Sequence, residues 1–172
     1  AQLVMSQEHD MDEHKLAKIS EQLRKTGWSA WFAPAIGTIG KGKKRGTSGV
    51  VGFAWRPSID ICRKPEDLEP GRLVATAMRT KAFGIIFVYS IYGVVGDIER
   101  TAAIWEVAYR HTQSHGLPFI IGGDHNQEPK VMAQRWLGPL VIVQTSLPTC
   151  RTSEPGSHLD YFGIHPILEF VS

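Results

Sequence analysis

The sequence predicts a single layered domain of the α/β or α+β class. Short apolar runs typical of strands alternate along the chain with segments whose apolar residues recur at helical spacing. A length of 172 residues allows one domain with a hydrophobic core, so we expect residues 1–172 to form one domain. The mixture of strand pairs and crossing helices predicts packed layers rather than an all-parallel sheet.

The first part of the chain predicts a strand, a helix and further strands. A short strand at 3–6 precedes Asp10-Met11-Asp12-Glu13, which has the spacing of a capping box with Asp10 as the N-cap. Leucine and isoleucine then recur at helical spacing, and Gly27 is the expected stop. The next expected elements are a strand at 28–32, a glycine- and lysine-rich loop at 35–46, strands at 48–55 and 73–78, and a connection with Pro65 and Pro70 between the last two.

The second part predicts a long strand, a long helix and a strand that ends in polar residues. Residues 83–92 are apolar, β-branched and aromatic, which is the strongest strand pattern in the chain. Asp97 is the expected N-cap of a helix that ends at Gly116. The remaining expected elements are a buried strand at 119–122, a short helix at 129–136, and strands at 140–144 and 158–165.

Composition places few limits on the partners of the chain. The formal net charge is only +2, so a nucleic-acid partner cannot be argued from total charge. The one dense basic run is Lys41, Lys43, Lys44 and Arg45, interrupted by glycines. This run is either a solvated loop or a loop that contacts phosphate groups.

The cysteines and the apolar runs predict an intracellular protein, cytoplasmic or nuclear and not secreted. Two cysteines, Cys62 and Cys150, do not make a disulfide framework, which favours a reducing compartment. The longest apolar runs are too short to span a bilayer, so we expect no membrane association. The N-terminus has no signal-peptide pattern and enters a strand almost at once, from which we expect that the domain begins before this chain does.

The segment Gly123-Asp124-His125-Asn126 carries the strongest chemical signal. It follows the apolar residues of the strand at 119–122, so a carboxylate and an amide should lie at the end of that strand. Phosphoryl chemistry uses such a pair, because the carboxylate can orient or deprotonate water and the amide can donate to a phosphate oxygen. An Asx-turn after a strand gives the same pattern, and the tetrapeptide alone does not separate the two readings.

Three other segments carry candidate groups in order around this one. Glu8 closes the first strand, where a carboxylate suits Mg²⁺. Tyr92 ends the strand at 83–92, and its hydroxyl could donate to a phosphate oxygen or be an ordinary buried hydroxyl. His158 and Asp160 are two residues apart in an expected strand, where they would share a face and could form a histidine–carboxylate pair.

Together these segments resemble the endonuclease/exonuclease/phosphatase superfamily, the fold of exonuclease III-type DNA repair enzymes and retroelement endonucleases. The resemblance implies a two-layer β-sandwich flanked by helices, here expected to lack the first and last strands. It runs from residue 7 to about residue 165. The matching segments are Gln7-Glu8, Gly46-Thr47-Ser48-Gly49-Val50, the strand ending in Tyr92, Gly123-Asp124-His125-Asn126, and Leu159-Asp160-Tyr161-Phe162.

The resemblance implies metal-assisted, in-line hydrolysis of a phosphodiester with Mg²⁺ or Mn²⁺ as cofactor. Glu8 would hold the metal ion, and Asp124 would orient or deprotonate the attacking water. Asn126 and Tyr92 would contact the scissile phosphate, and Asp160 would support the catalytic histidine.

The expected substrate is nucleic acid, DNA rather than RNA. The expected function is that of a DNA endonuclease, and the endonuclease part of a retroelement is one form that it can take. The basic loop supports this choice, since Lys43, Lys44, Arg45 and Ser48 could contact the substrate backbone.

This sequence departs from the family pattern at both ends. The family's additional first strand, its last strand and its Ser-Asp-His segment have no counterpart here, and we hypothesise that His158 takes over phosphate stabilisation. Three functions therefore stay open: an active enzyme, a catalytically impaired nucleic-acid-binding or relic domain, and a domain whose strands are completed by a homodimer or another partner chain.

Overall fold

A computed structural model describes residues 2–7, 11–34, 36–39, 45–48, 51–144, 146–149 and 157–171. The helices are α1 (Glu13–Lys25), α2 (Ile98–His115) and α3 (Pro129–Arg135), and a 3-10 helix covers Pro166–Val171. The strands are β1 (Leu3–Gln7), β2 (Ser29–Phe32), β3 (Ile36–Ile39), β4 (Arg45–Ser48), β5 (Val51–Trp55), β6 (Asp60–Glu69), β7 (Leu73–Thr80), β8 (Gly84–Tyr92), β9 (Phe119–Asp124), β10 (Val141–Val143) and β11 (Asp160–Ile164).

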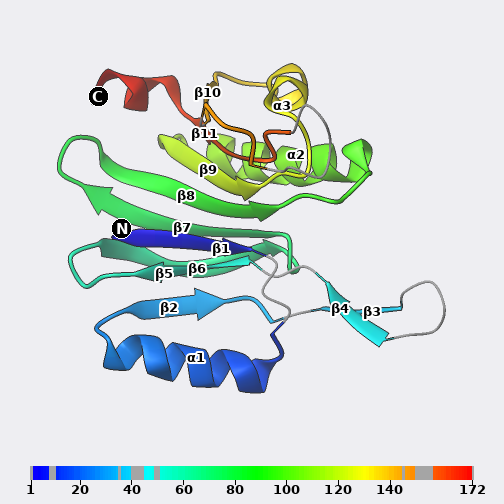
Figure 1. The fold of residues 1–172 in the computed structure, drawn as a ribbon. Coiled ribbons are helices and arrows are strands. Elements are labelled where there is room, and N and C mark those ends of the chain that lie inside the picture. The colour runs from blue at the N-terminus through cyan, green and yellow to red at the C-terminus, as the bar shows by residue number, and fades with distance from the viewer. Residues whose placement is uncertain are drawn as a thin grey trace.

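Two sheets stack face to face to form a sandwich (Figure 1). The larger sheet has the strand order β10-β11-β9-β8-β7-β6, and the smaller has the order β1-β5-β2. All neighbouring strands in these two sheets are antiparallel except β8 and β9, which are parallel and joined through α2. The parallel pair requires this long crossover, because a tight turn can join only antiparallel strands.

The sequence of β8 explains why it lies at the centre of the larger sheet. Residues 86–92 are buried without interruption, because one face packs on the smaller sheet and the other on the helices. Ile86, Val88 and Tyr92 join Val51 and Phe53 of β5 in the core between the sheets.

The helices cover the two outer faces of the sandwich (Figure 1). On the larger sheet, Ile104 and Trp105 of α2 pack on Phe87, Tyr89 and Ile91 of β8. On the smaller sheet, α1 lies against the face opposite the core. The layers are thus α1, the smaller sheet, the larger sheet, and α2 with α3.

Most of the expected elements are confirmed, and the others differ in their bounds or in their type. The cap of α1 is Asp12, whose side chain accepts from the Lys15 N–H at 2.9 Å, and not Asp10 as the capping-box pattern predicted. The expected loop at 35–46 contains β3 and part of β4, which pair as a ribbon beside the sandwich (Figure 1). Ser48 consequently belongs to β4, and the strand expected at 48–55 begins at Val51.

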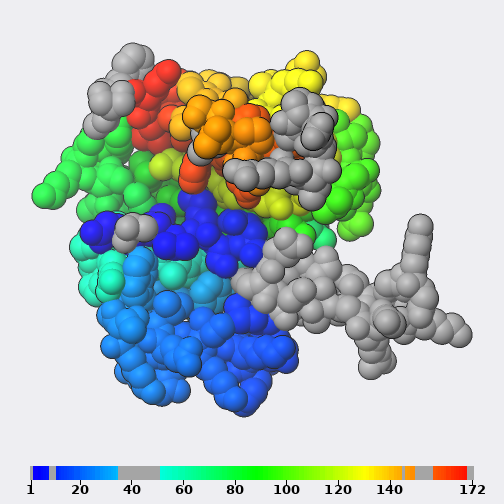
Figure 2. Space-filling view, in the orientation of Figure 1, coloured from blue at the N-terminus to red at the C-terminus, as the bar shows by residue number. Residues whose placement is uncertain are grey.

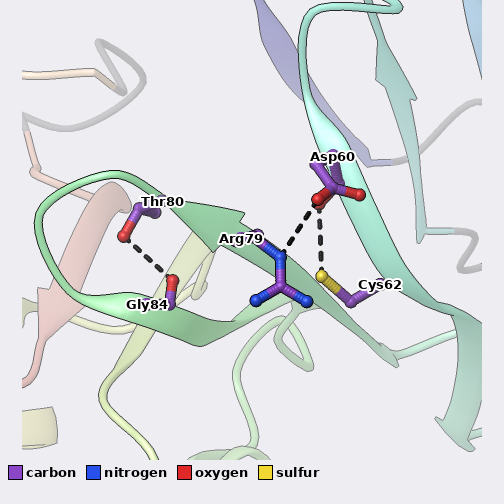
Figure 3. Close-up of polar contacts among 5 residues, drawn as sticks. All are labelled: Asp60, Cys62, Arg79, Thr80 and Gly84. Atoms are coloured by element: carbon purple, nitrogen blue, oxygen red, sulfur yellow. Dashed lines mark hydrogen bonds and ion pairs between the residues drawn. The ribbon is translucent and has the colours of Figure 1, made fainter.

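The connection expected between residues 55 and 73 is mostly the edge strand β6. Its pairing with β7 is interrupted by register shifts. Such shifts are common at a sheet edge and beside a proline such as Pro65, which has no N–H to donate. At one end of this pair, Arg79 Nε donates to Asp60 Oδ2 at 3.2 Å, and the exposed Cys62 donates its thiol to the Asp60 carbonyl at 3.6 Å (Figure 3). Thr80 Oγ1 donates to the Gly84 carbonyl at 3.0 Å and closes the turn into β8 (Figure 3).

Within the described parts of the chain, no helix combines the length and apolar character needed to cross a bilayer. Cys150 lies outside the described residues.

The N-cap of α2 should contribute measurably to stability. Asp97 accepts from the Arg100 N–H at 3.0 Å, so Asp97→Ala should lower the free energy of unfolding by about 1 kcal/mol. Urea titration followed by circular dichroism measures the change. Glu106→Ala is the control, since it removes only the exposed pair with Arg110 and should cost less than about 0.5 kcal/mol. Equal effects of the two substitutions would contradict the assigned cap.

Candidate functional site

Four side chains form a row across neighbouring strands at one end of the larger sheet. Asp160, the first residue of β11, lies directly opposite Asp124, the last residue of β9. Asp124 in turn lies opposite Tyr92, the last residue of β8. The Tyr92 N–H donates to the Arg72 carbonyl at 2.8 Å, which extends the β7–β8 pairing by one residue. Directly opposite residues share a face, so two acids, a tyrosine and an arginine stand side by side.

The end of β1 meets this row from the smaller sheet. Gln7 Nε2 donates to the buried Ser90 Oγ at 3.0 Å, which ties β1 to β8. Gly123 makes the close approach feasible, because a Cβ there would stand 2.1 Å from the Ile91 carbonyl oxygen and 2.9 Å from Gln7 Nε2. Its φ of 144° also falls where side chains are strained. Figure 2 shows the dark-blue surface of β1 between the two layers on this face.

Asp124 and Asn126 form a closed turn at the end of β9. The Asn126 N–H donates to Asp124 Oδ1 at 2.9 Å, which is the Asx-turn left open by the sequence. Asn126 has φ 52°, a left-handed conformation that asparagine tolerates better than most residues. Its Nδ2 donates to the Gly93 carbonyl at 3.2 Å. Both side chains thus hold the turn, and this structural role does not prevent a chemical one, because a carboxylate has further acceptor positions.

The turn sits against Gly93, where two backbones nearly touch. The Gly93 N–H donates to the Asp124 carbonyl at 2.8 Å. A Cβ at residue 93 would stand 1.9 Å from the His125 carbonyl oxygen, so only glycine fits here. This packing accounts for the glycine at residue 93.

His125 is a buried anchor of the same turn. It has no exposed surface, and its ring stacks on Tyr161 with the centroids 3.9 Å apart. Trp105 Nε1 donates to Nδ1 at 3.2 Å, which leaves the Nε2 proton to donate to the Tyr161 carbonyl at 3.2 Å. Burial lowers the pKa of His125 to about 3, so the ring is neutral at physiological pH.

Tyr92 is almost completely buried. Its side chain is only 5% exposed and packs between the sheets with Val51 and Phe53. The guanidinium of Arg72 stands 4.6 Å from the centre of its ring. Contact between Tyr92 and a phosphate group stays a prediction.

His158 and Asp160 do not share a strand face. β11 begins at Asp160, so His158 lies in the segment before it and is half-buried. Its Nδ1 is buried and has no hydrogen-bond partner among the residues that the structure describes. Thr149 fixes the entry to β11, since its Oγ1 accepts from the N–H groups of Leu159 and Asp160 at 2.9 and 3.0 Å. Asp160 itself is exposed.

Several predicted site residues cannot be placed. Glu8, Lys43 and Lys44 lie outside the described residues, and of Arg45 and Ser48 only the backbone strand β4 is described. Their assigned roles stay predictions.

Sequence reasoning missed Arg72 and Thr149, and it gave Gln7 no role of its own although Gln7-Glu8 is one of the matching segments. Arg72 could have been found by counting back from the turn at residues 80–84, because equal steps along β7 and β8 bring it opposite Tyr92. Gln7 and Thr149 carry no such signal, since their partners depend on how distant segments pack.

Comparison with solved structures defines the fold. The catalytic domain of human Nocturnin superposes with a TM-score of 0.63 at 17% identity, over 96% of this chain and 69% of that one. An endonuclease/exonuclease/phosphatase family protein from Bacteroides thetaiotaomicron gives 0.61 at 16%, over 96% and 69%. A mannosyl-6-phosphatase from the same organism gives 0.58 at 16%, over 96% and 71%.

The chain has the endonuclease/exonuclease/phosphatase fold. The two-layer sandwich flanked by helices that the sequence predicted is therefore confirmed. No protein-family model and no curated protein sequence matches the chain. Likeness at this level of identity establishes the fold, and activity must be argued from the site.

The carboxylate oxygens at this site are donors of the type that a hard divalent cation such as Mg²⁺ prefers. Among the described residues, no group of three His, Cys, Asp or Glu side chains could hold a metal ion. Mg²⁺ needs only one or two carboxylates, because it keeps several of its waters. Asp124 and Asp160 supply two directly opposite carboxylates, whose mutual repulsion a cation would offset.

The depressed pKa of His125 predicts a pH dependence of stability. Between its ordinary value of 6.5 and about 3, the unfolded chain binds a proton that the folded chain excludes. Stability should therefore fall as pH drops through this interval, by up to about 1.4 kcal/mol per pH unit from this group. His125→Phe keeps an aromatic ring in the stack and removes this contribution, so its stability should depend less steeply on pH.

Urea unfolding at a series of pH values across that interval measures the two slopes. His14→Gln, an exposed histidine on α1, is the matched control and should leave the slope unchanged. Parallel pH profiles for wild type and His125→Phe would show that the buried ring does not exclude the proton.

Proposed function

We propose that this protein is a Mg²⁺- or Mn²⁺-dependent phosphodiesterase that cleaves nucleic acid as an endonuclease, DNA in preference to RNA. The observation that carries the proposal is the row of Asp160, Asp124 and Tyr92 at the strand ends, with Asn126 in the adjoining turn. It joins carboxylates and neutral donors at one end of the sheet, as phosphoryl transfer requires.

Each residue has one part in the proposed reaction. Asp124 orients or deprotonates the attacking water. Asn126 and Tyr92 stabilise charge on the phosphate oxygens. His158, whose Nδ1 has no hydrogen-bond partner within the described part of the chain, adds a donor to the phosphate, and Asp160 supports it electrostatically.

The metal ion would neutralise charge on the scissile phosphate and lower the pKa of bound water. Glu8 is proposed as its ligand, with Asp160 and Asp124 completing the negative surroundings. Gln7, which precedes Glu8, is held to Ser90 beside the row, and this supports the assignment.

The proposed substrate is nucleic acid, and the contacts proposed for it are Lys43, Lys44, Arg45 and Ser48. Their phosphate contacts would be independent of base sequence and weakened by salt. The Nocturnin catalytic domain has been solved with a bound sulfate anion, which supports an anion site in this fold.

A binding or relic domain without turnover is the second candidate. The hydrogen bonds that occupy Asp124 Oδ1 and Asn126 Nδ2 favour it, because they give both side chains a purely structural use. A retroelement origin stays a prediction under either reading.

Nicking of supercoiled plasmid in Mg²⁺, in Mn²⁺ and in EDTA tests the enzyme against the binding domain. Asp124→Asn keeps an oxygen that can accept the Asn126 N–H and removes the charge. It should lower the metal-dependent nicking rate by about 10²-fold or more, because a positioned base contributes that much. Asp124→Ala, which also loses the hydrogen bond of the turn, should be no more active than Asp124→Asn.

The outcomes separate the two candidates. Wild-type protein that nicks no faster than Asp124→Ala in either metal ion is not an endonuclease. Salt-sensitive DNA binding in that same sample would support the binding domain. Equal activity of wild type and Asp124→Asn would show that the carboxylate serves only the turn. Matched DNA and RNA strands test the preference for DNA.

The homodimer or strand-supplying partner stays a prediction. It is supported by the position of β1, which pairs with β5 alone among the described strands and so lies at an edge of the smaller sheet. The Arg56 N–H donates to the Gln2 carbonyl at 2.9 Å, so the backbone groups of Gln2 point toward β5. Successive residues of an antiparallel strand alternate in this direction, so the backbone groups of Leu3 and Met5 point away from β5. Beside this edge lies a groove of about 620 Å³, lined mainly by apolar side chains that include Met5, Ile120 and Phe162. We propose that β1 of a second copy pairs along this edge.

Light scattering across a concentration series tests the dimer. The mass of the wild type should rise towards that of two chains, and Leu3→Pro should remain monomeric because it removes an outward N–H at the start of the strand. Val4→Thr, on the other face of β1, should behave like the wild type. A monomeric mass for the wild type at every concentration would exclude the dimer.

A further inference from the structure

The carbonyl of Gly93 joins two side chains of the site. Its oxygen accepts from Arg72 Nη1 at 3.0 Å and from Asn126 Nδ2 at 3.2 Å. The N–H of the same residue donates to the Asp124 carbonyl. One residue thus connects the start of β7 to the turn that carries Asp124 and Asn126.

Arg72 is itself fixed by its backbone. Its N–H donates to the Glu69 carbonyl at 2.9 Å, and its own carbonyl accepts from the Tyr92 N–H at 2.8 Å. Because Arg72 lies directly opposite Tyr92, their side chains are on the same face of the sheet.

The guanidinium of Arg72 makes two contacts at once. Its Cζ lies over the ring of Tyr92, 4.6 Å from the ring centre, while Nη1 donates to the Gly93 carbonyl. A planar guanidinium can stack and donate together, whereas the compact ammonium of lysine cannot reproduce both contacts.

We propose that Arg72 is a positioning residue, which holds the ring of Tyr92 and, through the Gly93 carbonyl, the side chain of Asn126. The kinetic consequences rest on the proposed function, and the geometric claim does not. Positioning affects kcat, because small displacements of groups that contact the reacting phosphate slow the reaction. If Arg72 contacted the substrate directly, its substitution would raise KM instead.

The chain offers a clean probe of the geometric claim. Asn126 is the single asparagine in the sequence, so ¹⁵N-asparagine labelling gives one side-chain amide pair in a two-dimensional NMR spectrum. Arg72→Gln should shift this pair and speed its exchange with solvent, because the acceptor at Gly93 is no longer held in place. Arg72→Lys should give a smaller change, since it keeps the charge without the planar fork.

Arg56 provides a matched control. Its Nη1 donates to the Thr26 carbonyl at 2.7 Å, and its guanidinium lies 4.4 Å from the centre of the Trp28 ring. Arg56 thus makes the same two kinds of contact as Arg72, but outside the row. Arg56→Gln should leave the Asn126 amide pair where the wild type has it.

Metal-dependent cleavage by the same variants gives the second readout. Arg72→Gln should lower kcat about 10- to 100-fold with KM changed less than about threefold, and Arg56→Gln should change neither. Free guanidinium ion added to Arg72→Ala should restore part of the lost kcat.

Three results would overturn the proposal: an Asn126 amide pair unmoved in Arg72→Gln, a kcat equal to that of Arg56→Gln, or a rise in KM alone. If Arg72→Gln does not fold, Arg72→Lys carries both measurements. If the wild type cleaves nothing, the proposed function fails, and the NMR comparison still decides whether Arg72 holds Asn126.

Discussion

The candidate site depends on the register of four neighbouring strands, above all on the parallel pairing of β8 with β9. This pairing sets Tyr92 beside Asp124, and the antiparallel neighbours then bring Arg72 to one side and Asp160 to the other. A slip of one residue would turn a strand's side chains to the opposite face. The burial of β8 on both faces opposes such a slip. A slip would turn the residues that face the smaller sheet toward the helices, and those that face the helices toward the smaller sheet.

Backbone contacts, more than side chains, hold the polar groups of the site. Gly93 and Gly123 let main chains approach to distances that no Cβ allows, and the neutral ring of His125 fixes the turn from within the core. Polar groups supported this way are preorganised, because the hydrogen bonds that orient them form on folding. The Asx-turn that sequence reasoning set against a catalytic role is part of this support.

Sequence patterns predicted the elements whose signals are local. The apolar run before Tyr92, the cap at Asp97 and the strand before Asp124 were all found. β6 was missed because an edge strand with charged side chains and Pro65 lacks the alternation of a half-buried strand. The burial of His125 and the position of Arg72 depend on Trp105, Tyr161 and Tyr92, which are distant in sequence, so pattern alone could not supply them.

The crossover through α2 has a consequence for the order in which the site can form during folding. Parallel pairing of β8 with β9 must close the long crossover through α2, whereas the β7–β8 hairpin is local. The hairpin can therefore bring Arg72 to Tyr92 early, and both aspartates join only after long-range pairing. The arrangement of the candidate site belongs to the completed tertiary structure, because its residues come from strands that are distant in sequence.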